Sequence, residues 1–243
     1  MRDARGRARR RTVTPMWSLD RRVAAAAVVI SAFALAIPIA VADAPAPTGA
    51  GGPVAAVREL VALANRGAAQ TWLVTYAFTR TTDTAGQLHD TIVEAHGPSL
   101  DVDDGLGSLV VTTQRRTYSC TVVGATPQCL ARPVAGDTAH PGDVYGGAVV
   151  SGRYTIARAP AATIAGLDAA CFILRLIRGS PIPGLGFSSE QCYSRDGVPL
   201  LSRVQTSAAV DERSALTVRR TVGRAELLSV LQPYGLARLL PDR

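Results

Sequence analysis

The pattern of apolar positions predicts a helix followed by a strand at the start of the folded part. From Val54 onward, apolar residues recur at steps of three and four, with Pro53 in the first turn and Gly67 just past the end. From Thr71 to Arg80 the period changes to two, and the large apolar side chains occupy alternate positions at Trp72, Val74, Tyr76 and Phe78. This alternation is typical of a half-buried strand.

Two series of short strand-like runs follow, separated by turn residues such as Gly, Pro and Asp. We expect strands at about 88–96, 99–103, 108–114, 116–123, 127–132, 152–157, 162–164, 170–177, 190–194, 199–208 and 215–221. Gly and Pro disfavour a regular helix between the two series, where we expect at most a short helical turn near 144–151. Residues 226–231 are expected to form a short helix after the last strand. Strands without intervening helices predict an antiparallel meander.

A nineteen-residue apolar run, Val23–Val41, precedes this region and contains one polar residue, Ser31. Its length suffices to span about 30 Å of hydrocarbon, and the arginine-rich flank before it would stay in the cytoplasm. We therefore expect four parts: a cytoplasmic basic tail, a transmembrane anchor in the cell membrane, a linker and an extracytoplasmic domain, at 1–22, 23–42, 43–53 and 54–243.

The alternative is a signal peptide cleaved near Ala42, which would release a secreted protein. Residues 40–42 form an A-x-A cleavage pattern, and Met16 offers a second start that would give a conventional short basic region. No Cys stands directly after the apolar run, so the sequence does not predict a lipid-anchored N-terminal cysteine.

The net charge of +7 is concentrated in the basic tail. Residues 1–22 hold eight arginines and two aspartates, whereas the remaining 221 residues hold eighteen arginines and seventeen acidic residues. A nearly neutral domain lacks the excess positive charge that binds phosphate, and twelve aromatic residues are few for stacking on bases. We therefore expect no nucleic acid among its partners.

Four cysteines, Cys120, Cys129, Cys171 and Cys192, all follow the apolar run. They allow three connectivities, and their spacing favours disulfides Cys120–Cys129 and Cys171–Cys192, each joining the two arms of a hairpin. A metal site built from all four would need C-x2-4-C spacing, and a redox centre would need C-x-x-C; the sequence offers neither.

Known catalytic, cofactor and metal patterns are absent from the sequence. The group His89, Asp90, Glu94 and His96 fails as a metal site, because the two histidines are seven residues apart on a strand and point to opposite faces. There is no G-x-S-x-G, no P-loop and no G-x-G-x-x-G opening a helix. We expect neither an enzyme nor a cofactor or metal.

The order of elements resembles the lipoprotein-carrier superfamily, which includes the LolA/LolB half-barrels, the LppX/LprG-type lipid carriers and RseB-like sensor domains. Residues 163–174 and 192–202 are similar to the "xxxAG-xxxxCxxV … xCYxxDGxPL" hairpins of such proteins. The resemblance covers 54–232 in the order of elements and about 160–205 in residues.

This resemblance implies an α+β fold, in which an antiparallel half-barrel-like sheet with N-terminal and C-terminal helices encloses an apolar cavity for acyl chains or a lipidated peptide. The wall of the ligand cavity would include Trp72, Val74, Tyr76, Phe78, Val110, Phe172, Leu174 and Leu200. We therefore expect a membrane-tethered, non-catalytic binding protein for a lipid, lipoprotein or other apolar ligand. The alternative is a regulatory domain whose cavity is filled by its own side chains, and whose partner is an envelope protein such as an anti-sigma-like factor.

Overall fold

The computed structural model describes residues 52–240, apart from residues 85, 98, 124–125 and 135–139. The chain divides into two units, Met1–Asp43 and Ala44–Arg243, and every described residue belongs to the second. The predicted tail and the predicted anchor at 23–42 lie outside the described residues. No helix among the described residues combines the length and the hydropathy needed to cross a membrane.

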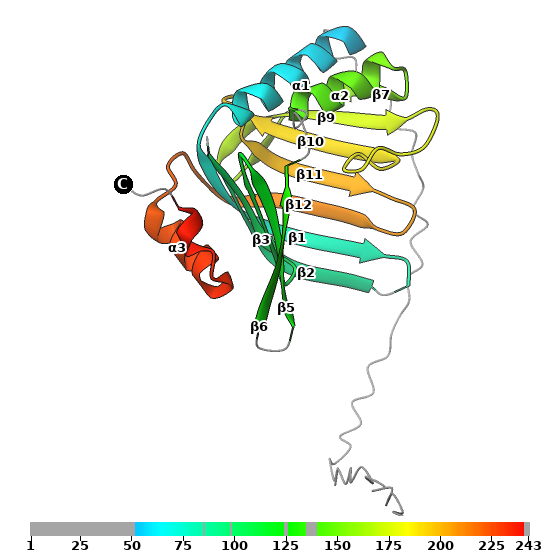
Figure 1. The fold of residues 1–243 in the computed structure, drawn as a ribbon. Coiled ribbons are helices and arrows are strands. Elements are labelled where there is room, and N and C mark those ends of the chain that lie inside the picture. The colour runs from blue at the N-terminus through cyan, green and yellow to red at the C-terminus, as the bar shows by residue number, and fades with distance from the viewer. Residues whose placement is uncertain (1–51, 85, 98, 124–125, 135–139, 241–243) are drawn as a thin grey trace, which may run out of the picture. The chain divides into compact units, whose positions relative to one another are not determined.

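Twelve strands form one open sheet in which every pairing is antiparallel. The spatial order is β6-β5-β4-β3-β2-β1-β12-β11-β10-β9-β7, and β8 also pairs with β9 (Figure 1). This arrangement confirms the expected antiparallel α+β architecture and is consistent with a half-barrel. The strands are β1 (Trp72–Thr82), β2 (Gly86–His96), β3 (Leu100–Gly105), β4 (Ser108–Thr113), β5 (Arg116–Val123), β6 (Thr126–Pro133), β7 (Tyr154–Arg158), β8 (Ala162–Ile164), β9 (Leu167–Leu176), β10 (Ser188–Ser194), β11 (Pro199–Gln205) and β12 (Val210–Arg219).

Three helices cover parts of the two faces of this sheet (Figure 1). On the face that we call the inner face, α1 (Pro53–Ala68) and α2 (Pro141–Val150) pack against each other and against β7 and its neighbours. On the opposite, outer face, α3 (Arg224–Leu231) and two short 3-10 turns (Gln232–Tyr234, Ala237–Leu239) pack against the strands of the first series.

The helix α2 differs from the expected short turn, because it runs for ten residues from Pro141. Proline is tolerated in its first turn, where the backbone N–H has no partner within the helix. Its glycines, which disfavour an isolated helix, allow close packing on α1: a Cβ atom on Gly142 would overlap the Asn65 side chain. Tertiary packing therefore outweighs local helix propensity here.

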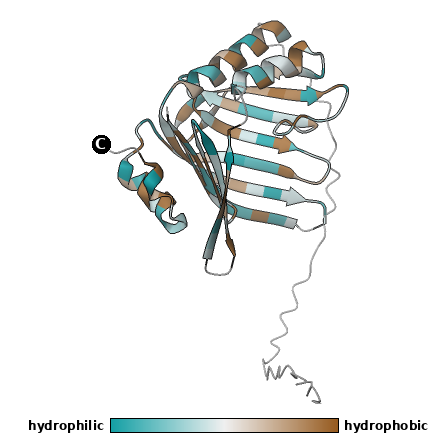
Figure 2. Ribbon diagram, viewed as in Figure 1, coloured by the Kyte–Doolittle hydropathy of each residue, from teal (hydrophilic) through white to brown (hydrophobic). Residues whose placement is uncertain are grey.

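Alternation along the strands distributes the core over both faces, and Figure 2 shows hydrophobic and hydrophilic residues alternating along them. Beneath α1 and α2, a cluster on the inner face includes Leu60, Phe172 and Leu174. A central cluster contains the predicted stripe from Trp72 to Phe78. On the outer face, Leu73 packs with residues of β3, β4 and the C-terminal helices.

Both predicted disulfides are present, Cys120–Cys129 between β5 and β6 and Cys171–Cys192 between β9 and β10. In each case the two residues lie directly opposite one another in the strand pairing, so each bond joins the arms of a hairpin as the spacing predicted. All four cysteines of the chain are used.

The end of α1 makes the closest backbone approach to the sheet, and it generates a stability prediction. A Cβ atom on Gly67 would overlap the carbonyl group of Gly197 in the turn between β10 and β11. We therefore expect Gly67→Ala to lower the free energy of unfolding by about 2–3 kcal/mol in urea denaturation. The control is Gly147→Ala in α2, which meets no neighbouring atom and should raise stability by up to about 1 kcal/mol. Equal effects of the two variants would contradict the close approach.

Candidate functional site

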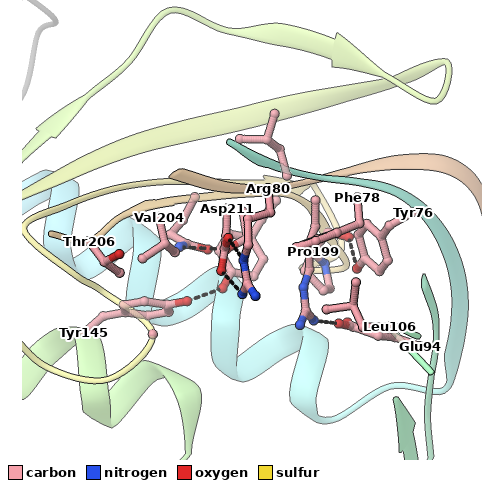
Figure 3. Close-up of a pocket in the computed structure, with 16 residues that line it drawn as sticks. Tyr76, Phe78, Arg80, Glu94, Leu106, Tyr145, Pro199, Val204, Thr206 and Asp211 are labelled. Carbon is pink, nitrogen blue, oxygen red and sulfur yellow. Dashed lines mark hydrogen bonds and ion pairs between the residues drawn. The ribbon is translucent and has the colours of Figure 1, made fainter. Parts of the chain in front are cut away.

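A cavity of about 470 Å³ opens on the inner face of the sheet, beside the part that α1 and α2 cover. Its walls come from β1, β2, β10, β11 and β12, with Tyr145 added by α2 and Leu106 by the turn between β3 and β4 (Figure 3). The volume falls in the range of sites that bind small molecules.

Two aromatic side chains of the predicted stripe, Tyr76 and Phe78, line this cavity and are almost fully buried. The Tyr76 hydroxyl donates a hydrogen bond of 3.0 Å to the carbonyl oxygen of Pro199. Burial, with a further contribution from the charge of Glu94, raises the pKa of Tyr76 well above its ordinary value. Tyr76 is therefore a neutral phenol, suited to contact a ligand through its ring.

A second aromatic pair borders the cavity on the side of the helices. Tyr145 and Tyr193 approach edge to face, with ring centroids 6.5 Å apart and hydroxyl oxygens 2.8 Å apart. Burial raises the pKa of both hydroxyls. This pair separates the cavity from the packed cluster beneath α1 and α2.

Charged residues also line the cavity, which the sequence did not predict. The Arg80 guanidinium donates two hydrogen bonds of 2.7 Å to the Asp211 carboxylate, in a bidentate ion pair between β1 and β12. These two residues are direct partners in the β1–β12 register. Their side chains extend the wall beyond Phe78 (Figure 3).

Arg213 forms a second ion-pair group, with two carboxylates that lie across β1 on the first meander. Its guanidinium contacts Glu94 on β2 and lies 3.3 Å from the Asp103 carboxylate on β3. Burial raises the pKa of the Glu94 carboxyl, and the positive charge of Arg213 opposes this rise. Arg213 therefore offsets the unfavourable burial of a carboxylate in the cavity wall.

A smaller hollow of about 240 Å³ adjoins the first and shares Glu94 with it. The Trp72 ring stacks on His96, with centroids 5.4 Å apart. His96 has an acceptor at each ring nitrogen: Nε2 lies 2.8 Å from the Ala68 carbonyl oxygen, and Nδ1 is paired with the Asp101 carboxylate. The bond to Asp101 raises the pKa of His96, because the protonated ring donates to both acceptors.

The structure divides the eight residues predicted as cavity wall into two groups. Four of them line hollows: Tyr76 and Phe78 the larger one, Trp72 and Val110 the smaller one. The other four have no exposed surface and belong to packed clusters, namely Val74, Phe172, Leu174 and Leu200. Much of the apolar inner face is therefore filled by the protein's own side chains.

The charged wall residues were missed because their positions depend on pairing between distant strands. Asp211 and Arg213 lie in the first part of β12, which begins at Val210 instead of the expected residue 215. The one signal in the sequence was the alternation itself, which continues from Phe78 to Arg80 on the same face of β1.

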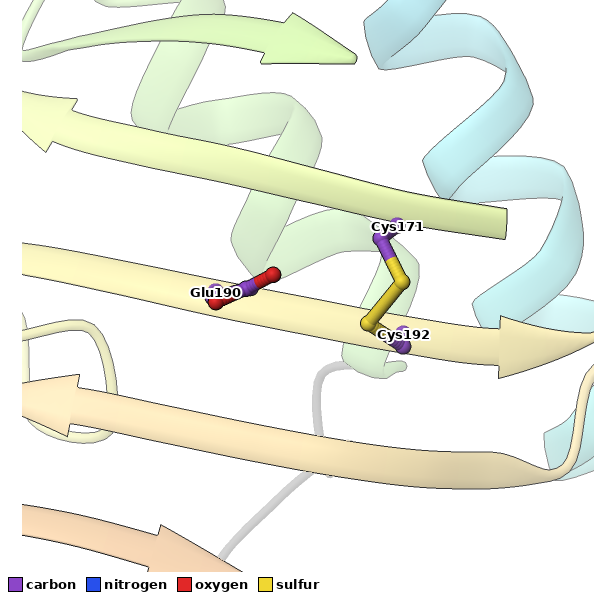
Figure 4. A group of neighbouring side chains, drawn as sticks. All are labelled: Cys171, Glu190 and Cys192. Atoms are coloured by element: carbon purple, nitrogen blue, oxygen red, sulfur yellow. A yellow bond between two sulfur atoms is a disulfide. The ribbon is translucent and has the colours of Figure 1, made fainter. Parts of the chain in front are cut away.

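Among the described residues, one group has the ligand atoms for a metal within 4.8 Å of one another: Cys171, Glu190 and Cys192 (Figure 4). The two sulfur atoms are joined in a disulfide, so neither is a thiolate that could bind a metal. Within this group, only the Glu190 carboxylate could bind a metal. The predicted geometry of His89 and His96, on opposite faces of β2, agrees with the strand that they share.

No protein-family model and no curated protein matches the chain. Among solved structures it is similar to MucB, with 15% identity and a TM-score of 0.45 over 71% of this chain and 62% of that one. It is also similar to LprF from Mycobacterium bovis (9% identity, TM-score 0.34, 71% and 97% covered) and to a LolA superfamily protein from Nitrosomonas europaea (11%, 0.31, 69% and 94%). These are likenesses of fold, and the chain spans less than two thirds of MucB.

The His96 arrangement predicts a pH dependence of stability. Because the folded-state pKa is raised, the contribution of His96 is fully present below about pH 6.5, the ordinary pKa, and is lost as the pH rises through the folded-state value. The effect should be below about 1 kcal/mol, since Asp101 is half exposed. Urea denaturation of His96→Gln across this range should show the loss of that slope. The control His89→Gln should retain it, and an unchanged slope in His96→Gln would refute the assignment.

The Arg213 group predicts a non-additive pair of substitutions. Arg213→Met should lower the free energy of unfolding by about 2 kcal/mol, because it leaves the Glu94 carboxylate buried without its counter-charge. Adding Glu94→Gln should restore part of this loss, as a double-mutant cycle in urea would measure. The control Arg203→Met removes an exposed ion pair with Glu212 and should change stability by less than about 0.5 kcal/mol. Strict additivity of the first two substitutions would show that the charges do not interact.

Proposed function

We propose that the chain is a non-catalytic binding protein of the cell envelope, tethered through residues 23–42, with its domain outside the membrane. Its inner-face cavity takes an amphiphilic ligand, namely an acyl lipid or the lipidated part of a lipoprotein. The observation that carries this proposal is the mixed cavity wall, in which Tyr76 and Phe78 lie beside the ion pairs of Arg80 and Arg213.

An amphiphile fits this wall because each part of it meets matching chemistry. The rings of Tyr76 and Phe78, with Leu106 and Val204, offer apolar surface whose burial stabilises a complex by about 25 cal/mol per Å². The guanidinium groups of Arg80 and Arg213 can donate hydrogen bonds to a polar head group. A purely apolar ligand would leave these charged groups covered without compensation.

Binding without catalysis is supported by the way in which the ionisable groups are held. Asp211 is held by Arg80 and Glu94 by Arg213, while the phenols of Tyr76 and Tyr193 have raised pKa values. Acid–base or nucleophilic catalysis needs a nucleophile and a base at hydrogen-bonding distance from each other and from a substrate. The cavity groups form structural pairs instead.

A second candidate function is an envelope regulatory domain with a protein partner. It is favoured by the complete burial of Val74, Phe172, Leu174 and Leu200, which fills the part of the inner face that an acyl chain would otherwise occupy. In this case the cavity receives side chains of the partner, such as an anti-sigma-like factor.

Native mass spectrometry distinguishes the two functions. Residues 43–243 would be expressed with an export signal and purified from a host with membranes, and the lipid extract of the protein would be analysed. We expect a co-purifying acyl lipid at one molecule per chain. Ser202→Phe, which places a large ring in the cavity wall, should abolish this species. Thr217→Phe, at an exposed position of β12 away from the cavity, is the matched control and should retain it.

A protein that carries no lipid and takes up none on addition would overturn the carrier function. If the same protein captures an envelope protein partner, and Ser202→Phe weakens that capture, the regulatory function stands in its place. Retention of lipid by Ser202→Phe would indicate a binding site outside the cavity.

A further inference from the structure

Four large apolar side chains are exposed at one end of the domain, which we call the apolar end. They are Val54, Val150, Ile177 and Phe187, with 62%, 86%, 60% and 45% of their surface exposed. Isolated exposed apolar residues are ordinary on soluble proteins, whereas a group of them indicates an interaction surface.

Contacts between four different segments bring these residues together. The helices α1 and α2 run antiparallel, since Gly142 abuts Asn65 and Gly146 abuts Val61, so Val150 at the end of α2 lies beside the start of α1. The segment after α2 is bonded to the segment after β9 through the Ile177 amide and the Arg153 carbonyl, 2.8 Å apart. The Phe187 carbonyl accepts a bond of 2.8 Å from the Leu176 amide.

Arginines surround the apolar end without matching acidic residues. Arg178 donates to the Ser151 carbonyl at 2.7 Å, and Arg153 donates to the Ser180 carbonyl. Arg175 lies at the end of β9. Across the described part of the chain, no carboxylate forms an ion pair with any of the three. The apolar end therefore carries uncompensated positive charge, which complements an anionic surface.

The apolar end is also where the chain enters the domain. Val54 is the second residue of α1, and twelve residues, 42–53, separate it from the apolar run 23–41. Such a linker spans at most about 43 Å when fully extended. In Figure 1 the first turn of α1 and the arrowhead of β9 lie at the same end of the domain.

The cavity borders this end as well. Gly184, in the loop that contains Ile177 and follows β9, lines the cavity, as does Thr206 just after β11. The Phe187 amide donates 2.8 Å to the Gln205 carbonyl, which joins these two loops. A surface that docks at the apolar end therefore lies next to one side of the cavity.

We propose that the apolar end docks onto the surface of an anionic phospholipid bilayer. Val54, Val150, Ile177 and Phe187 enter the boundary between head groups and acyl chains, while Arg153, Arg175 and Arg178 contact the phosphates. This inference rests on the envelope location in the proposed function. It adds that the domain lies against the membrane with its cavity beside the lipid, instead of hanging free on its linker.

Vesicle co-sedimentation tests the docking with the fragment 44–243, which is one compact unit containing all three core clusters and both disulfides. Vesicles of phosphatidylcholine mixed equally with phosphatidylglycerol would be compared with phosphatidylcholine alone. We expect binding to the anionic vesicles that weakens when salt is raised from about 0.1 M to about 0.5 M. Thermal unfolding of each variant confirms that it is folded.

Paired substitutions make the test specific to the apolar end. Val150→Ser with Ile177→Ser should weaken binding at least about tenfold, because two apolar contacts are lost. Arg178→Gln should weaken binding about fivefold on anionic vesicles. The matched control is Val122→Ser with Leu130→Ser, which removes two similarly exposed side chains from β5 and β6 at the other edge of the sheet and should bind normally.

Several results would overturn the proposal: no binding to anionic vesicles, equal binding by the Val150/Ile177 variant, or loss in the control alone. Capture of an envelope protein that depends on Val150 and Ile177, without vesicle binding, would instead make this end a protein interface. The proposed ligand function can be contradicted independently of the docking. Vesicle binding by a protein that takes up no lipid would leave the docking in place and remove the carrier function, whereas Ser202→Phe should leave vesicle binding unchanged.

Discussion

The pairing of β1 with β12 is the constraint on which the rest of the structure depends. It joins the first strand of the domain to the last, and so unites two meanders in a single sheet. Its register sets Arg80 opposite Asp211 and Phe78 opposite Arg213. Because side chains alternate between faces, a slip of one residue between these strands would put Arg80 and the aromatic stripe on one face and Asp211 and Arg213 on the other. The cavity wall thus follows from one long-range register.

Coverage of the inner face by α1 and α2 then decides which part of the sheet is core and which part is cavity. The helices approach closely because glycine occupies the contacts, at Gly67 against Gly197 and at Gly142 against Asn65. Phe172 and Leu174 are sealed beneath them. Past the Tyr145–Tyr193 pair, no helix of the described residues covers the inner face, and the wall becomes mixed apolar and charged.

This division makes the two ends of the domain different, as the proposed function requires. The apolar end, the entry of the chain and one side of the cavity are neighbours, since they share the loops after β9 and β11. The disulfides join the arms of two hairpins, β5–β6 and β9–β10, and the second of these hairpins carries the loop of the apolar end. A ligand in the cavity and a bilayer at the apolar end would contact adjacent surfaces of one sheet.

The sequence by itself determined the features that depend on neighbours along the chain. The period of two from Trp72 to Phe78 and the cysteine spacings predicted the strand and both disulfides, because each is a local pattern. Tertiary structure decided the length of α2, where packing on α1 outweighs its glycines. It also decided the charged wall, because Arg80, Glu94, Asp211 and Arg213 meet only through pairing between β2, β1 and β12. Alternation assigns a residue to a face, but only the register between distant strands determines its partner.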